Sequence, residues 1–95
     1  MDKNFKQEHQ FEIIRFLYQF KDDNKYYRLD ENLLNDKSHE EKYDVIYTLR
    51  DNAMIATDRE IYFNNSTKSF VYNYNEDEIK AKILPKGIVA VETIL

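Results

Sequence analysis

Apolar positions three and four residues apart predict a helix over the first part of the chain, from Phe5 to Phe20. Asn4 precedes this segment, and its side chain can accept hydrogen bonds from the amides of the first turn, so we predict it as the N-cap. After a polar break at 21–25, Tyr26–Leu29 predicts a short extended piece and Asp30–Asn35 a short second helix. The first helix is expected to bury a side made of Phe11, Ile14, Leu17 and Tyr18.

The strongest helix signal in the chain follows Ser38. Ser38 and Glu41 have the spacing of a capping box, in which the hydroxyl and the carboxylate each satisfy an amide that the helix leaves without a partner. Behind this cap the apolar positions keep the helical period up to an end near Asn52 to Met54. We expect the helix to bury the side formed by Val45, Ile46, Leu49 and Ala53, with Lys42 at its edge.

After the capped helix the period of the pattern changes to two, which is typical of strands. Ile55–Phe63 predicts the first strand, with Ile61 and Phe63 on one face and Tyr62 on the other. Asn64–Lys68 is a polar turn.

Two further strands and a terminal helix complete the pattern. Ser69–Tyr74 predicts the second strand, and the polar turn 75–78 leads to a third at Ile79–Ile83. Pro85 suits the first position of a helix because its fixed backbone angle is already helical. The apolar side of this last helix is expected to be Ile88, Val91 and Leu95.

The predicted fold class is α+β, with three helices, a small antiparallel β-sheet and a short C-terminal helix in a single domain over residues 1–95. One Gly and one Pro leave little room for long irregular loops. The chain has no Cys, which excludes disulfides, and its longest apolar run, Ile88–Val91, is far below the ~20 residues of a membrane-spanning helix. With no apolar segment near its polar start, the sequence predicts a cytoplasmic protein that does not enter a membrane.

Two segments resemble parts of small bacterial winged-helix domains. Val45–Ile55 resembles the recognition helix with its exit into the first strand of the wing, and Ile83–Ile88 resembles the leucine, threonine, any, lysine, glycine segment that opens the final helix. The order of predicted elements agrees with this family over nearly the whole chain. The resemblance implies a bacterial or phage regulatory domain that makes contacts through its third helix and its wing.

The sequence departs from the family pattern at two positions. The threonine that caps the last helix would fall at Leu84, which cannot cap. The glycine at the end of the recognition helix is replaced by Asn52 or Ala53. Of these two residues, asparagine tolerates the left-handed conformation of a helix end far better.

Nothing in the sequence has the pattern of a catalytic, cofactor or metal site. With a single glycine, Gly87, a glycine-rich phosphate loop cannot be built. His39 stands beside Glu40 and Glu41 at the start of the capped helix, where a solvated helix start explains the three residues better than a metal site. We therefore predict no enzymatic activity, no cofactor and no small-molecule substrate.

The aromatic content is high, with eight Tyr and six Phe, and aromatic side chains can stack on single-stranded bases. Most of them, however, fall at positions predicted to face the core. Those expected at the surface are Tyr43, Tyr47 and Tyr62.

The outward face of the capped helix bears on the kind of partner. The formal net charge is −4, and a helix entering the major groove would bring carboxylates toward phosphates spaced at one charge per ~1.7 Å of duplex. Lys80, Lys82 and Lys86 form a modest basic stripe elsewhere, and Lys68 is the only cation of the wing turn. We predict recognition of a protein, with sequence-specific duplex-DNA binding by a transcriptional regulator as the alternative. The expected contact residues are Glu40, Asp44, Tyr47, Thr48, Arg50 and Asp51 of the helix and Asn64, Asn65 and Lys68 of the wing.

Self-association is a further expectation, because four apolar residues lie among the last eight. A short helix is marginal alone and must pack on something. We predict a symmetric homodimer in which the terminal helices help to bury each other. The alternative is a monomer in which the helix folds back on Phe11 and Leu17. The four residues are Ile88, Val91, Ile94 and Leu95.

Overall fold

The computed structural model describes residues 3–29, 33–34, 37–71 and 78–94, and the side chains of residues 8–29, 33–34, 37–71 and 78–93. In these ranges the fold is α+β. Its elements are α1 (Lys3–Tyr18), β1 (Tyr27–Arg28), α2 (His39–Asp51), β2 (Ile55–Thr57), β3 (Tyr62–Asn64), β4 (Ser69–Val71), β5 (Lys80–Ile83) and α3 (Pro85–Ile94).

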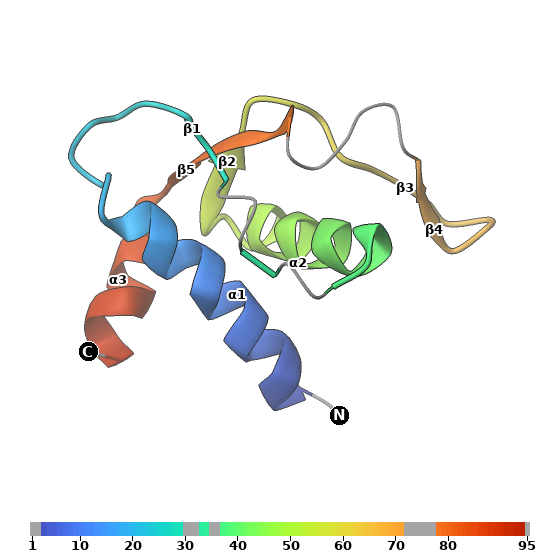
Figure 1. The fold of residues 1–95 in the computed structure, drawn as a ribbon, viewed down its shortest axis with the longest axis horizontal. Helices are drawn as coiled ribbons and strands as arrows, with labels where there is room; N and C mark the ends of the chain where they lie inside the picture. Colours follow the sequence, from blue (N-terminus) through green and yellow to red (C-terminus); the bar gives the residue numbers. More distant parts are fainter. Residues whose placement is uncertain (1–2, 30–32, 35–36, 72–77, 95) are drawn as a thin grey trace.

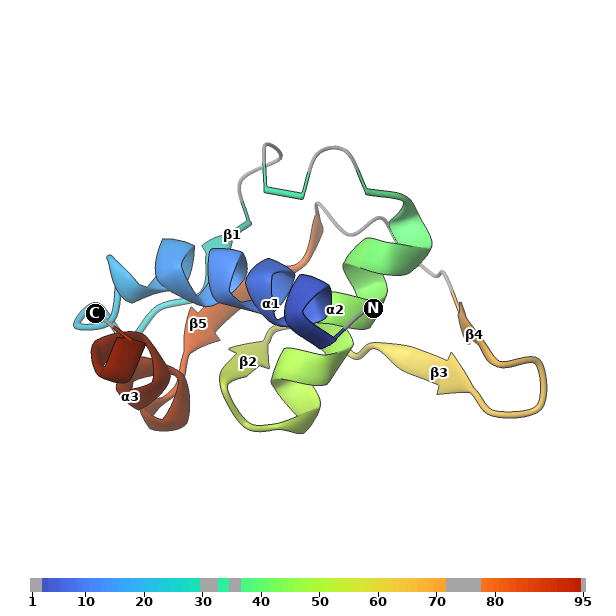
Figure 2. The same cartoon turned by 90° about the horizontal axis from the view of Figure 1, so that it is seen from below.

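The strands form two separate antiparallel sheets. In the first, β5 lies between β1 and β2, with Tyr27 opposite Ala81 and Ile55 opposite Ile83. The second is the hairpin of β3 and β4, which projects away from α1 and α3 (Figures 1 and 2). Helices α1 and α2 pack against the three-stranded sheet, and α3 packs on α1. The core lies between these helices and the sheet, and its most completely buried side chains are Ile13, Leu17, Tyr43, Leu49, Ile55, Ile79 and Val91.

The first helix is confirmed, but its predicted N-cap is wrong. Helix α1 begins at Lys3, so Asn4 lies inside it. An N-cap stabilises by only about 1 kcal/mol, so a capping residue alone does not fix where a helix starts. The other end closes with a tighter turn, in which the amides of Phe20 and Lys21 donate to carbonyls three residues back. The predicted helix Asp30–Asn35 lies mostly outside the described residues, and Leu33 and Leu34 form a turn.

The capping box of α2 is confirmed in both directions. The Ser38 hydroxyl accepts from the amide of Glu41 at 3.2 Å, and the Ser38 amide donates to the Glu41 carboxylate at 3.0 Å. Val45, Ile46 and Leu49 are buried as predicted. The capping box thus starts α2 where the sequence placed it.

The Glu41 carboxylate should make stability depend on pH. Its hydrogen bonds with Ser38 hold its pKa below the ordinary value of 4.5. A lowered pKa in the folded state contributes stability that is present above the ordinary value and is lost as the pH falls through the folded value. We expect Glu41→Gln, which keeps an acceptor, to remove this contribution. Urea unfolding of both proteins at several pH values measures it: the difference in stability should shrink toward low pH, and a difference independent of pH would contradict the assignment.

The C-terminal end of α2 is a Schellman motif. The Met54 amide donates to the Leu49 carbonyl at 2.9 Å and the Ala53 amide to the Arg50 carbonyl at 3.1 Å. Contrary to the expectation that asparagine would take the left-handed position, Asn52 has φ −89° and Ala53 has φ 61°. The Asn52 amide still donates to the Thr48 carbonyl, so the helical hydrogen bonding continues to Asn52. The left-handed position is therefore the next residue, Ala53. The same turn exposes Ala53, which therefore does not belong to the buried side.

We expect Ala53→Gly to stabilise the protein by about 0.5–1 kcal/mol. A non-glycine residue in the left-handed conformation costs about 1–2 kcal/mol. Glycine removes this cost, but its greater conformational freedom in the unfolded chain offsets part of the stabilisation. Thermal or urea unfolding measures the change. Asn52→Gly is the control, because the right-handed φ of Asn52 offers no strain to relieve. The same effect from both variants, or no stabilisation by Ala53→Gly, would show that Ala53 carries no strain.

The single strand predicted at Ile55–Phe63 is wrong, since it is divided between β2 and β3. The Asp58 carboxylate accepts from the Lys80 amide, and the Thr57 hydroxyl donates to the Arg59 carbonyl. The local Thr57–Arg59 bond competes with the continuation of the strand, and the long-range bond between Asp58 and Lys80 holds the chain at the division.

The other strand predictions hold in the described ranges. Ile61 is buried and Tyr62 exposed, which confirms their opposite faces. The second predicted strand is seen as β4, and its remainder, 72–74, lies outside the described residues. The third is confirmed as β5.

Helix α3 begins at Pro85 as predicted and uses its apolar side within the chain. Val91 is buried, Ile88 packs against the core, and Tyr18 of α1 donates to the Glu92 carboxylate at 3.0 Å. These contacts agree with the fold-back alternative. The side chains of Ile94 and Leu95 lie outside the described residues, and the homodimer remains a prediction.

Candidate functional site

The predicted contact face of α2 is acidic in the structure. Glu40 and Asp51 are exposed, whereas Asp44 and Thr48 are half-buried. The Thr48 hydroxyl donates to the Asp44 carbonyl at 2.8 Å, so it is used within the helix. The charge on this face therefore comes mainly from carboxylates.

Arg50, the only cation among the predicted contact residues of α2, is paired with a residue that sequence reasoning missed. Its Nη2 donates to both carboxylate oxygens of Glu60 at 2.9 Å, and Glu60 lies between β2 and β3. The two residues are ten apart, one in α2 and the other in the connection between β2 and β3, so no local pattern links them. The pair leaves the positive charge of Arg50 locally compensated.

The inner face of the hairpin covers part of α2 with aromatic rings. Tyr47 lies 5.6 Å from Phe70 and 6.2 Å from Phe63, measured between ring centroids, and the two phenylalanines are 5.0 Å apart. Tyr43, 6.0 Å from Phe70, is only 1% exposed. The expectation of an exposed Tyr43 is wrong, and Tyr47 is only half exposed, because the hairpin folds over this side of α2.

The outer face of the hairpin carries an exposed apolar pair, Tyr62 and Val71. These residues lie opposite each other in register, and they are 50% and 43% exposed. Tyr62 was expected at the surface, whereas Val71 was not singled out. The alternation of faces along a strand could have predicted the exposure of Val71, because a buried Phe70 places the next residue on the opposite face.

The predicted wing residues form the turn of this hairpin. The Asn64 side chain accepts from the amides of Ser66 and Thr67 at 2.8 and 3.3 Å, so it shapes the turn. Lys68 has φ 57° and is exposed, as is Asn65. Asn65 and Lys68 are exposed in this turn, and their contact with a partner remains a prediction.

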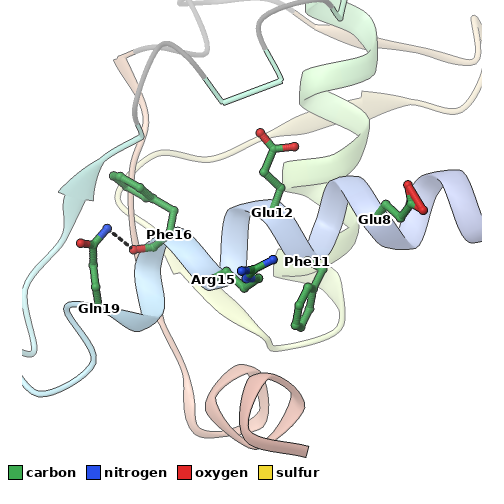
Figure 3. Close-up of a pocket in the computed structure, with 6 residues that line it drawn as sticks. All are labelled: Glu8, Phe11, Glu12, Arg15, Phe16 and Gln19. Atoms are coloured by element: carbon green, nitrogen blue, oxygen red, sulfur yellow. Dashed lines mark hydrogen bonds between the residues drawn. The ribbon is translucent and has the colours of Figure 1, made fainter. Parts of the chain in front are cut away.

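A shallow hollow runs along one side of α1 (Figure 3). Within it, the Arg15 guanidinium lies 5.5 Å from the Phe11 ring centroid, the Glu12 carboxylate accepts from the Leu34 amide at 3.2 Å, and Gln19 donates to the Phe16 carbonyl at 2.9 Å. These contacts fix the side chains on the surface of α1. They place no nucleophile next to a general base, as a catalytic site would require. The lining residues are Glu8, Phe11, Glu12, Arg15, Phe16 and Gln19.

In the described part of the chain, no three histidine or acidic side chains gather as metal ligands would. No described helix combines the length and the apolar character needed to cross a membrane.

Comparisons with known proteins give no relative. No protein-family model matches the chain, and neither the curated proteins nor the solved structures contain a match.

Proposed function

We propose that the chain is a non-enzymatic, winged-helix-like interaction domain that binds a protein partner. The contact surface consists of the outer face of the hairpin and the adjoining acidic side of α2. The observation that carries the proposal is the pair Tyr62–Val71, two apolar side chains about half exposed and opposite each other on the hairpin. Aromatic residues at the centre of a patch with charged residues around it are typical of protein interfaces.

The hairpin is held firmly enough to present this pair. Its inner rings, Phe63 and Phe70, pack against Tyr47, and aromatic pairs at such distances add about 0.5–1.5 kcal/mol beyond their buried area. A preorganised surface loses less conformational entropy on binding than a loose loop. The aromatic packing under the hairpin therefore favours its use in recognition.

The order of elements supports the winged-helix reading. Helix α1, the capped helix α2, the hairpin of β3 and β4 and helix α3 follow one another in the order that the resemblance implies, while the expected short second helix lies mostly outside the described residues. For such a fold, duplex DNA is the second candidate partner, by analogy of fold alone.

The charges favour protein over DNA. A helix in the major groove needs cations for the phosphates, and Arg50 is already matched by Glu60. The carboxylates of Glu40, Asp44 and Asp51 lie on the same helix and would repel the phosphate backbone of DNA.

We expect random duplex DNA to bind no tighter than about 10⁻⁴ M at physiological salt, the weak end of non-specific binding. Fluorescence anisotropy at low and moderate salt measures this. Arg50→Ala should change the affinity little, because its charge is compensated. Glu60→Gln is the matched variant, and it should strengthen binding slightly by releasing that charge. Submicromolar binding that is lost on Arg50→Ala or Lys68→Ala would establish a DNA reader and overturn the proposal.

Site-specific photo-crosslinking tests the protein partner directly. A crosslinking amino acid at position 62 or 71 should capture one defined protein, and Tyr62→Ser with Val71→Thr should abolish binding of that purified protein. Val89, exposed by 60% on α3, offers the matched control position, from which no such product should form. Equal crosslinking from position 89, or full binding by the double variant, would exclude the hairpin as the contact surface.

A further inference from the structure

The outward face of the three-stranded sheet is basic. In β5, Ala81 and Ile83 are buried, so Lys80 and Lys82 point to the other side. Arg28 of β1 lies opposite Lys80 in register and is exposed. The fold therefore brings together cations that are more than fifty residues apart in the chain.

An exposed aromatic ring lies beside these cations. Tyr26 is 41% exposed, and the Lys82 ammonium lies 5.2 Å from its ring centroid. Lys82 also donates to the Asn24 side chain at 3.1 Å, which holds the ammonium near the ring. We call Tyr26, Arg28, Lys80 and Lys82 the basic sheet face.

The charge of this face contrasts with the rest of the chain. The segments 24–28 and 80–86 contain no acidic residue, although the formal net charge of the whole chain is −4. Lys25 and Lys86 add exposed cations to the two segments. Among the described residues, carboxylates at the border of the face include Asp58, which accepts from the Lys80 amide at 2.8 Å, and Glu78, which precedes β5. The described cations of these two segments gather on one side of the molecule, where a polyanion can contact them.

We propose that the basic sheet face binds single-stranded nucleic acid. Proteins that hold single strands without sequence preference combine cations along the backbone with aromatic rings on which bases stack. Here both features occupy one face: the Lys82 ammonium lies over the Tyr26 ring, and the ring is still 41% exposed, which leaves surface on which the flat side of a base can stack. In a duplex the neighbouring base pairs cover that side, and an acidic peptide offers no base to stack. This face is separate from the hairpin and α2, so the inference is independent of the proposed protein partner.

Fluorescence anisotropy with a labelled oligothymidine and oligouridine of about 12 nucleotides, within the usual site size, tests the proposal on the full chain. We expect binding that weakens with salt, with a log–log slope of about −0.7 for each phosphate contacted. Lys80→Gln with Lys82→Gln should weaken binding at least tenfold and reduce the slope by about 1.4. Lys42→Gln with Lys68→Gln removes the same charge from α2 and the hairpin, and it should leave the affinity nearly unchanged.

Two variants test the ring and the border of the face. Tyr26→Ala should weaken binding about tenfold, whereas Tyr26→Phe, which keeps the stacking surface, should not. Asp58→Asn keeps an acceptor for the Lys80 amide and should tighten binding by removing a charge.

Three outcomes would overturn the proposal. The first is no binding at low salt, and the second is equal weakening by the two lysine pairs. The third is binding of a duplex, polyglutamate or anionic phosphatidylserine vesicles as tight as that of the oligonucleotides, with no effect of Tyr26→Ala. Circular dichroism spectra of each variant show whether a loss of binding comes from a loss of fold.

Discussion

Leu49→Asp is expected to cost several kcal/mol and to leave little folded protein at room temperature. Leu49 is fully buried on the inner side of α2, and an aspartate there would bury a carboxylate with no partner. A domain of this size has a total stability of about 5–15 kcal/mol, so one such change can remove most of it. Ile46 is 2% exposed and lies on the same side of the helix, so Ile46→Asp should have the same effect. Circular dichroism during thermal and urea unfolding measures the loss.

Val89→Asp is the control for this prediction. It makes the same kind of replacement, an apolar residue by aspartate, at an exposed position of α3. Because solvent stabilises the charge there, the change should stay within about 0.5 kcal/mol. Melting of Leu49→Asp within a degree of the parent protein would mean that the buried side of α2 is assigned wrongly.

Gly87→Ala is expected to destabilise the protein by about 1–3 kcal/mol, although the same change in an exposed helix gains about 1 kcal/mol. The sign reverses because a Cβ at Gly87 would lie 2.5 Å from the Met54 carbonyl oxygen and 2.9 Å from Cγ1 of Ile83. The Met54 carbonyl accepts from the Leu84 amide at 2.9 Å, so it cannot retreat without weakening that hydrogen bond. Helix α3 would have to move off the end of α2.

Differential scanning calorimetry should show this as a fall in melting temperature of about 5–15 °C. Thr93→Ala, at an exposed position of the same helix, is the control and should keep or slightly raise the melting temperature. A Gly87→Ala protein as stable as the parent would show that α3 has room to shift, and that the close approach to Met54 does not constrain the fold.

Much of the candidate site could be predicted from the sequence. The features that could not be predicted all have the same cause. The helical period located α2 and its acidic outward residues, and alternation placed Tyr62 at the surface. Three features depend on contacts between elements: the compensation of Arg50 by Glu60, the burial of Tyr43, and the meeting of Arg28 with Lys80. A pattern along one segment contains no information about such contacts.

By itself, the sequence determined the α+β class, the capping box that starts α2, the burial of Val45, Ile46 and Leu49 and the start of α3 at Pro85. These features depend on neighbours within about four residues, where backbone geometry fixes which side chains meet. Only the tertiary structure decided that the strand after α2 divides at Asp58 and that the hairpin covers Tyr43 and Tyr47. It also brought Arg28 beside Lys80 and Tyr26 beside Lys82. These arrangements join residues far apart in the chain, and packing and long-range hydrogen bonds select them after local preferences have been met.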